Sequence, residues 1–311
     1  MIYVGIDLGG MSAKAGVFKD GELILKERVE TNPSDGFQGV ADKLVFLAKS
    51  VTQNAGFSFK NVQAIGIGSP GVIDSAKGVV AKWGNYNWID VPLGQEVARL
   101  TDKKVYLTND ANAAALGEAK FGVGAKYKDC LLITLGTGVG GGIVIDGKLF
   151  EGYRSTGAEL GHAVLMVGGE QCTCGRKGCF EAYASATALI RDTKRAMEAN
   201  KDSKLWEVGS LDAVNGKTPF DYYDKDEAAK GVVDKYITML GAGITNLANE
   251  FRPQAIILGG GVCAQGETLL KPLREILKNE LFAGEKGPQV ELLIATLGNN
   301  AGLLGAAALW M

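Results

Sequence analysis

The sequence lacks the features that mark a membrane protein or a nucleic-acid-binding protein. No apolar run in its 311 residues approaches the about 18 residues that a membrane span needs. Residues 1–7 contain no basic segment of the kind that opens a signal peptide. The net charge is −2, from 33 basic and 35 acidic residues, which argues against a basic surface for nucleic acid or lipid. We therefore expect a cytoplasmic protein without nucleic-acid or membrane partners.

Histidine and cysteine are scarce, whereas glycine is abundant. The chain has one histidine and five cysteines, and the absence of a signal peptide argues against disulfides. Glycine accounts for 44 of the 311 residues, which is twice the usual share of ~7%, and it shows no collagen repeat. These glycines should serve turns and places where the backbone is closely approached.

The first third of the chain alternates between strand and helix patterns. Residues 2–7 form a β-branched run, and apolar runs flank Asp20-Gly21, which is a strong hairpin signal. Helical spacing covers 35–55, and 62–68 is the next predicted strand. This alternation predicts an α/β fold.

A second hairpin repeats the first at an offset of 126 residues. Five residues of the first hairpin recur at this offset, among them Asp20-Gly21 as Asp146-Gly147, after a predicted strand at 130–135. Two unrelated Asp-Gly hairpins would be the simpler explanation, but five identities at one offset favour an internal duplication. We expect a small lobe at 1–118, a larger lobe at 119–298, and residues 299–311 packing back on the first.

The later part of the chain is mainly helical in pattern. Helices are predicted at 182–198, 227–251, 266–281 and 300–310, with strands at 254–258 and 290–294.

Glycine-rich turns follow three of the predicted strands, at 9–10, 136–142 and 259–261. Backbone without side chains can bring several N–H groups close to a phosphate. Any one turn could equally be a tight turn without a ligand, but the set of three favours phosphate. Neither a Walker-type loop nor a convincing dinucleotide fingerprint is present.

Two acids follow predicted strands. Asp7 ends a buried strand, where a carboxylate needs a partner such as a lysine or a metal-bound water. Asp110 opens an alanine-rich helix after Asn109, and it fits either a helix N-cap or a general base. The spacing alone does not choose between these two roles.

The only histidine lies beside the only cysteine cluster. His162, Cys172, Cys174 and Cys179 offer four ligands within 18 residues, which suits a tetrahedral structural zinc ion.

Two glutamates flank this cluster. Glu159 and Glu181 could bind the hydroxyls of a polyhydroxylated ligand. Alternatively, they are solvated or pair with Arg176 and Lys177.

Taken together, these features resemble the ROK family of bacterial sugar kinases and sugar-responsive repressors. The stretch from Leu135 to His162 is similar to the family signature, and Ser69-Pro70-Gly71, Asn109-Asp110 and the opening Asp7-Leu8-Gly9-Gly10 match as well. The resemblance covers essentially the whole chain.

The resemblance implies a duplicated actin-like ATPase (ribonuclease H-like) fold with ATP and Mg2+ in a cleft between two lobes, and a homodimer. It implies Asp110 as the general base toward a hexose hydroxyl, with sugar contacts from Asn85, Asn109, Asp110, Glu159, His162 and Glu181. The nucleotide contacts it implies are Asp7, Gly9, Gly10, Met11, Ser12, Thr137, Gly138, Gly140, Gly141 and Gly260.

Glucose phosphorylated at its 6-hydroxyl is the acceptor that the resemblance favours. Fructose, N-acetylmannosamine and N-acetylglucosamine are the alternatives, as is a sensor without catalysis. The family's repressors carry an N-terminal helix-turn-helix, for which a first strand at residue 2 leaves no room. Met11 departs from the family's usual threonine, and because a thioether donates no hydrogen bond, we expect weaker ATP affinity or a small change of register, but no loss of activity.

Overall fold

The computed structural model describes residues 1–310 as two compact units. The first unit comprises residues 1–132, 142–158 and 295–310, and the second unit comprises residues 133–141 and 159–294. Within residues 1–310 no helix combines the length and the apolar character that crossing a membrane requires.

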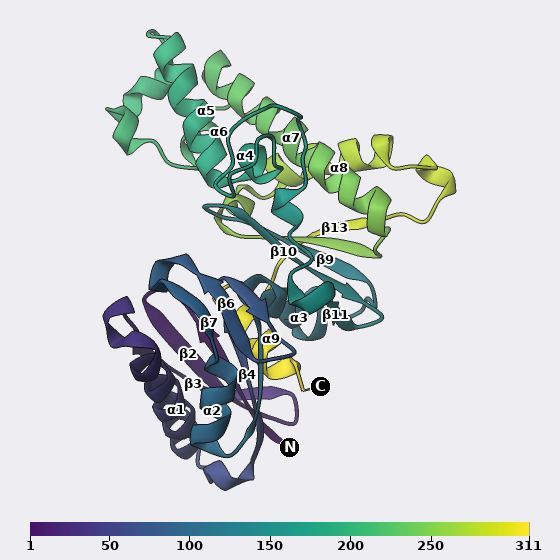
Figure 1. The fold of residues 1–311 in the computed structure, drawn as a ribbon. Helices are drawn as coiled ribbons and strands as arrows, with labels where there is room; N and C mark the ends of the chain where they lie inside the picture. The colour runs from purple at the N-terminus through teal and green to yellow at the C-terminus, as the bar shows by residue number, and fades with distance from the viewer. Residues whose placement is uncertain (311) are drawn as a thin grey trace. The chain divides into compact units, whose positions relative to one another are not determined.

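A five-stranded sheet forms the centre of the first unit, in the order β3-β2-β1-β4-β8 (Figure 1). The antiparallel strands are β1 (Ile2–Leu8), β2 (Ser12–Lys19) and β3 (Glu22–Glu30). Strands β4 (Val62–Ser69) and β8 (Lys104–Asn109) run parallel to β1. The carboxyl ends of β1, β4 and β8 therefore meet at one edge, which places Asp7, Ser69 and Asn109 in adjacent strands there.

Helices cover both faces of this sheet. The apolar sides of α1 (Gly36–Asn54) and α2 (Leu93–Thr101) share one core with Val4, Ile6 and Leu8 of β1. Because side chains alternate along a strand, Tyr3 and Asp7 face the opposite side, where α9 (Ala301–Ala308) packs beside α3 (Asp110–Phe121).

The second sheet repeats the first strand by strand, in the order β11-β10-β9-β12-β13. Its strands are β9 (Cys130–Leu135), β10 (Val139–Ile145), β11 (Lys148–Phe150), β12 (Ala255–Gly259) and β13 (Glu291–Ile294). The division between the units passes through β9 and β10.

Both hairpin turns have the same backbone conformation. Asp20 and Gly21 have positive φ, and so do Asp146 and Gly147. Two successive positive φ angles are what a two-residue type I′ turn requires. The matching turns and strand orders confirm the predicted duplication and the α/β fold class.

The remaining elements differ from the prediction in a divided helix and in elements that were not predicted, among them α2. The helix predicted at 182–198 is divided into α4 (Glu181–Ala184) and α5 (Ala186–Ala199), because Ser185 is extended and its hydroxyl caps α5 by accepting from the N–H of Ala188. A small antiparallel sheet of β5 (Val72–Asp74), β6 (Val79–Trp83) and β7 (Trp88–Val91) in the first unit was not predicted.

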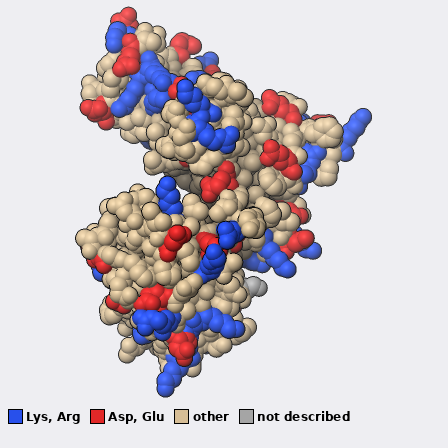
Figure 2. Space-filling view, viewed as in Figure 1, with Lys and Arg blue, Asp and Glu red and all other residues tan. Residues whose placement is uncertain are grey.

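Two other helices of the second unit follow the predicted pattern, α7 (Glu227–Phe251) and α8 (Glu267–Glu280), whereas the short α6 (Thr218–Asp221) was not predicted. Helix α7 packs against α5, α6 and α8. Lysines and arginines are interspersed with acidic residues on the face shown in Figure 2, in line with the small net charge.

Candidate functional site

Asp7 ends β1 beside a lysine. The neighbouring strand β2 places Lys14 directly opposite Asp7, with 3.4 Å between its Nζ and Oδ2 of Asp7. A β-carbon added to Gly302 of α9 would lie 3.2 Å from Oδ1 of Asp7, so a larger residue there would crowd the carboxylate. Asp7 therefore has the cationic partner that its position requires.

Asn109, and not Asp110, is the N-cap of α3. The Oδ1 of Asn109 accepts from the N–H groups of Ala111 and Asn112, and its Nδ2 donates to the carbonyl of Gly71 at 3.0 Å. The capping role is thus taken, and Asp110 stands as the first residue of the helix.

The carboxyl of Asp110 is shifted toward the neutral form. Burial raises its pKa above the ordinary value, and the negative charge of Asp7 raises it further. The N–H of Ala111, which donates to Oδ1 at 2.9 Å, lowers the pKa and limits this rise. A carboxylate with a raised pKa is a better proton acceptor than an exposed one.

The turn between β1 and β2 is tight and open to solvent. The N–H of Gly9 donates to the carbonyl of Ser12 at 2.8 Å, and the Met11 side chain is 78% exposed. Asn85, in the 3-10 helix Gly84–Tyr86, lies close by, since its Nδ2 is 3.5 Å from where a β-carbon of Gly10 would stand. The structure thus brings the first glycine turn and Asn85 together.

The glycine turn at 136–141 is closed around Glu181. The N–H of Val139 donates to Oε2 of Glu181 at 3.0 Å, and the hydroxyl of Thr173 donates to Oε1 at 2.7 Å. A β-carbon on Gly138 would lie only 2.3 Å from Oε2, so a larger residue at this position would force the Glu181 side chain to move. The alternative in which Glu181 pairs with Arg176 or Lys177 is wrong, because its carboxylate is engaged by the turn and the cysteine-rich loop.

The start of α5 and residue 260 support the same turn. The N–H of Ala186 donates to the carbonyl of Gly136 at 2.8 Å, and the hydroxyl of Thr187 donates to the carbonyl of Thr137 at 2.7 Å. Gly260 has a φ of 92° and lies against the backbone of Leu135, where a side chain would collide.

The four predicted metal ligands lie together. One ligand atom each from His162, Cys172, Cys174 and Cys179 falls within 4.8 Å of the others. Nδ1 of His162 is 3.7 Å from Sγ of Cys172, and the sulfurs of Cys174 and Cys179 are 3.7 Å apart. Tetrahedral zinc with Zn–S bonds of about 2.3 Å places its ligand atoms about 3.8 Å apart, so this cluster fits a zinc ion.

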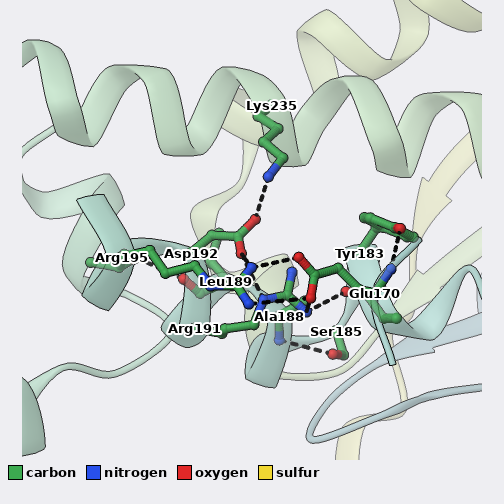
Figure 3. Close-up of polar contacts among 11 residues, drawn as sticks. Glu170, Tyr183, Ser185, Ala188, Leu189, Arg191, Asp192, Arg195 and Lys235 are labelled. Atoms are coloured by element: carbon green, nitrogen blue, oxygen red, sulfur yellow. Dashed lines mark hydrogen bonds and ion pairs between the residues drawn. The ribbon is translucent and has the colours of Figure 1, made fainter. Parts of the chain in front are cut away.

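Ion pairs fasten the cysteine-rich loop to the helices beside it (Figure 3). Glu170 accepts from Arg195 of α5 at 2.5 Å, and its N–H donates to the Tyr183 hydroxyl at 2.7 Å. Asp192 bridges Arg191 at 2.7 Å and Lys235 of α7 at 2.9 Å. Because several charges share these contacts, the network holds the loop better than one surface pair would.

Glu159 and the two other cysteines take no part in these contacts as the structure describes them. Glu159 is exposed and precedes the 3-10 helix Leu160–His162. Cys130 and Cys263 are buried, and burial raises their pKa to about 11 and about 12, so both are ordinary thiols.

Two residues of these sites were not found from the sequence. Lys14 was detectable by its register across the hairpin from Asp7, but Thr173 acts through a contact that no local spacing reveals.

Comparison with known proteins finds relatives over nearly the whole length of the chain. The profile of the ROK family matches residues 3–311. A glucokinase from Halalkalibacterium halodurans is 38% identical over 97% of this chain and 93% of its own length. The crystal structure of a ROK family glucokinase from Streptomyces griseus in complex with glucose and AMPPNP superposes with a TM-score of 0.79, at 36% identity and 99% coverage of both chains. A xylose repressor from Caldicellulosiruptor bescii is 29% identical over 93% of this chain and 72% of its own.

Proposed function

Since the chain belongs to the ROK family, we propose that it is an ATP-dependent glucose kinase that phosphorylates the 6-hydroxyl of the sugar. Its fold is the actin-like ATPase fold of the family's kinases. The observation that carries the proposal is Asp110, a half-buried carboxyl with a raised pKa at the strand edge that also holds Asp7.

Asp110 accepts the proton of the attacking sugar hydroxyl in this proposal. Its raised pKa makes that transfer more favourable than it would be to an ordinary aspartate. Asn109 fixes the start of α3, so that Asp110 is held on a rigid element rather than on a loop. The proposed sugar contacts are Asn85, Asn109, Glu159, His162 and Glu181.

The proposed nucleotide contacts come from three glycine turns. They are Asp7 and residues 9–12 at the first turn, Thr137, Gly138, Gly140 and Gly141 at the second, and Gly260 at the third. Mg2+ bound with ATP would neutralise the charge that develops on the transferred phosphoryl group. Lys14 pairs with Asp7 beside the first turn, and zinc on the His162 cluster would stiffen the loop that precedes Glu181.

The test is ADP release from Mg-ATP with a panel of glucose, fructose, N-acetylmannosamine and N-acetylglucosamine. Glucose should give the highest kcat/KM, 6-deoxyglucose should give no turnover, and Asp110→Asn should lower kcat by at least 100-fold, on the order of a lost general base. Asp102→Asn, at an exposed C-cap in the same unit, is the matched control and should retain activity. Glucose turnover by Asp110→Asn at the parent rate would refute the assignment.

A homodimer and a cytoplasmic location complete the proposal. Sedimentation of the purified chain tests the first, and cell fractionation tests the second.

A further inference from the structure

Thr31 lies between the first glycine turn and the loop that carries Asn85. It follows β3 and is fully buried. Its N–H donates to the carbonyl of Met11 at 3.1 Å, and its Oγ1 accepts from the hydroxyl of Tyr86 at 3.0 Å. One buried residue thus makes a hydrogen bond to each of two loops that are 75 residues apart in the sequence.

Tyr86 is itself held rigidly. Its ring stacks on Trp83 with 4.0 Å between ring centroids, and it meets the edge of Trp88 at 5.2 Å. It ends the 3-10 helix that presents Asn85, whose amide lies over Gly10. Two sets of contacts therefore join the turn at Met11 to Asn85: the direct contact at Gly10, and the hydrogen bonds of Thr31 to Met11 and Tyr86.

A purely structural role would be the simpler explanation, since a buried hydroxyl needs a partner. Thr52 shows what that role looks like in the same unit. It is equally buried, and its hydroxyl donates to the carbonyl of Ala48 within the same helix at 2.7 Å. Thr31 differs because both of its bonds leave its own element and end at candidate ligand-binding loops.

We infer that Thr31 and Tyr86 are positioning residues that couple the phosphate turn to the sugar loop. Nucleotide bound at residues 9–12 fixes Met11, and the Thr31–Tyr86 hydrogen bond then fixes Asn85 in its sugar-binding position. This inference rests on the proposed function, which assigns ATP and sugar to these two loops.

The variants Thr31→Val and Tyr86→Phe remove the side-chain bond and leave the backbone bond to Met11 in place. Each should raise the glucose KM about fivefold, the size of one neutral hydrogen bond, with kcat within twofold of the parent. The double variant should be no worse than either single variant, because both remove the same bond. Thr52→Val is the matched control and should lower Tm without changing KM.

A second measurement reports on the coupling without turnover. Trp206→Phe and Trp310→Phe leave Trp83 and Trp88 as the only tryptophans of the four. Adding Mg-ADP should change their fluorescence in this background, and Thr31→Val should abolish most of that change.

The outcomes separate the inference from the function on which it rests. Parent turnover with glucose, together with an unchanged KM and an unchanged fluorescence response in Thr31→Val, would overturn the coupling and leave the kinase standing. A parent that neither turns over any sugar nor responds to Mg-ADP would overturn the proposed function, and the coupling with it.

Discussion

Glycine at position 138 leaves room for the carboxylate of Glu181, and Gly138→Ala should displace it. The new β-carbon would stand 2.3 Å from Oε2 and 3.2 Å from the carboxyl carbon of Glu181. The backbone cannot retreat easily, because the carbonyl of Gly138 accepts from the N–H of Gly136 at 3.0 Å. The glutamate side chain must therefore move.

The cost follows from the bonds that Glu181 would lose. The N–H of Val139, a residue only 5% exposed, would be left without its acceptor, at a cost of about 1–3 kcal/mol. We expect Tm to fall by a few degrees. We expect the glucose KM to rise about tenfold, since about 1.4 kcal/mol of lost positioning corresponds to that factor.

Two comparisons make the assay decisive. Gly136→Ala is the matched control in the same turn, because a β-carbon there meets nothing within 4 Å. In a Glu181→Ala background, Gly138→Ala should add almost nothing, since the group it displaces is gone. Steady-state kinetics and thermal unfolding of the four variants measure both effects. Equal losses in Gly136→Ala and Gly138→Ala would refute the steric argument.

Three further predictions concern single residues. Because the folded-state pKa of Asp110 lies above its ordinary value of 3.8, ionisation of Asp110 destabilises the fold as pH rises through that pKa. Asp110→Asn should therefore raise Tm at pH 7, and this gain should vanish below about pH 3.8; an unchanged Tm at pH 7 would contradict it. Met11→Thr should lower the ATP KM several-fold, whereas Met11→Ala, which adds no donor, should leave it unchanged. Cys174→Ser should release zinc in a metal analysis, whereas Cys263→Ser, distant from the cluster in sequence and bonded to the carbonyl of Gly259, should retain it.

The sequence predicted those parts of the fold that depend on local patterns. The Asp-Gly hairpins have the backbone angles that such pairs favour, and the helix at Glu227–Phe251 has the predicted bounds. The sheet β5-β6-β7 escaped prediction because its strands are three to five residues long and its stability comes from aromatic packing around Trp83. Ser185 divided a predicted helix because serine caps a helix as readily as it continues one.

The metal ligands were predictable because all four lie within 18 residues, so one loop can bring them together. The role of Asp110 was not predictable from the sequence, because the choice between capping and catalysis depended on whether Asn109 was the N-cap. The partner of Glu181 was also beyond sequence reasoning, since Val139 lies 42 residues earlier in the chain.

The contacts of Val139 connect the glycine turn to the segment that carries the first zinc ligand. The N–H of Val139 donates to Glu181, and its carbonyl oxygen lies 2.1 Å from the position that a β-carbon of Gly161 would take. Gly161 must therefore be glycine, because a β-carbon there would collide with backbone, whereas a β-carbon on Gly138 would meet only the movable side chain of Glu181. The residue after Gly161 is the zinc ligand His162. Val139 and Gly161 thus form two sides of one packed contact. A substitution at Val139 or at Gly161 should then disturb the glycine turn and the metal loop together, even though only one of them is altered.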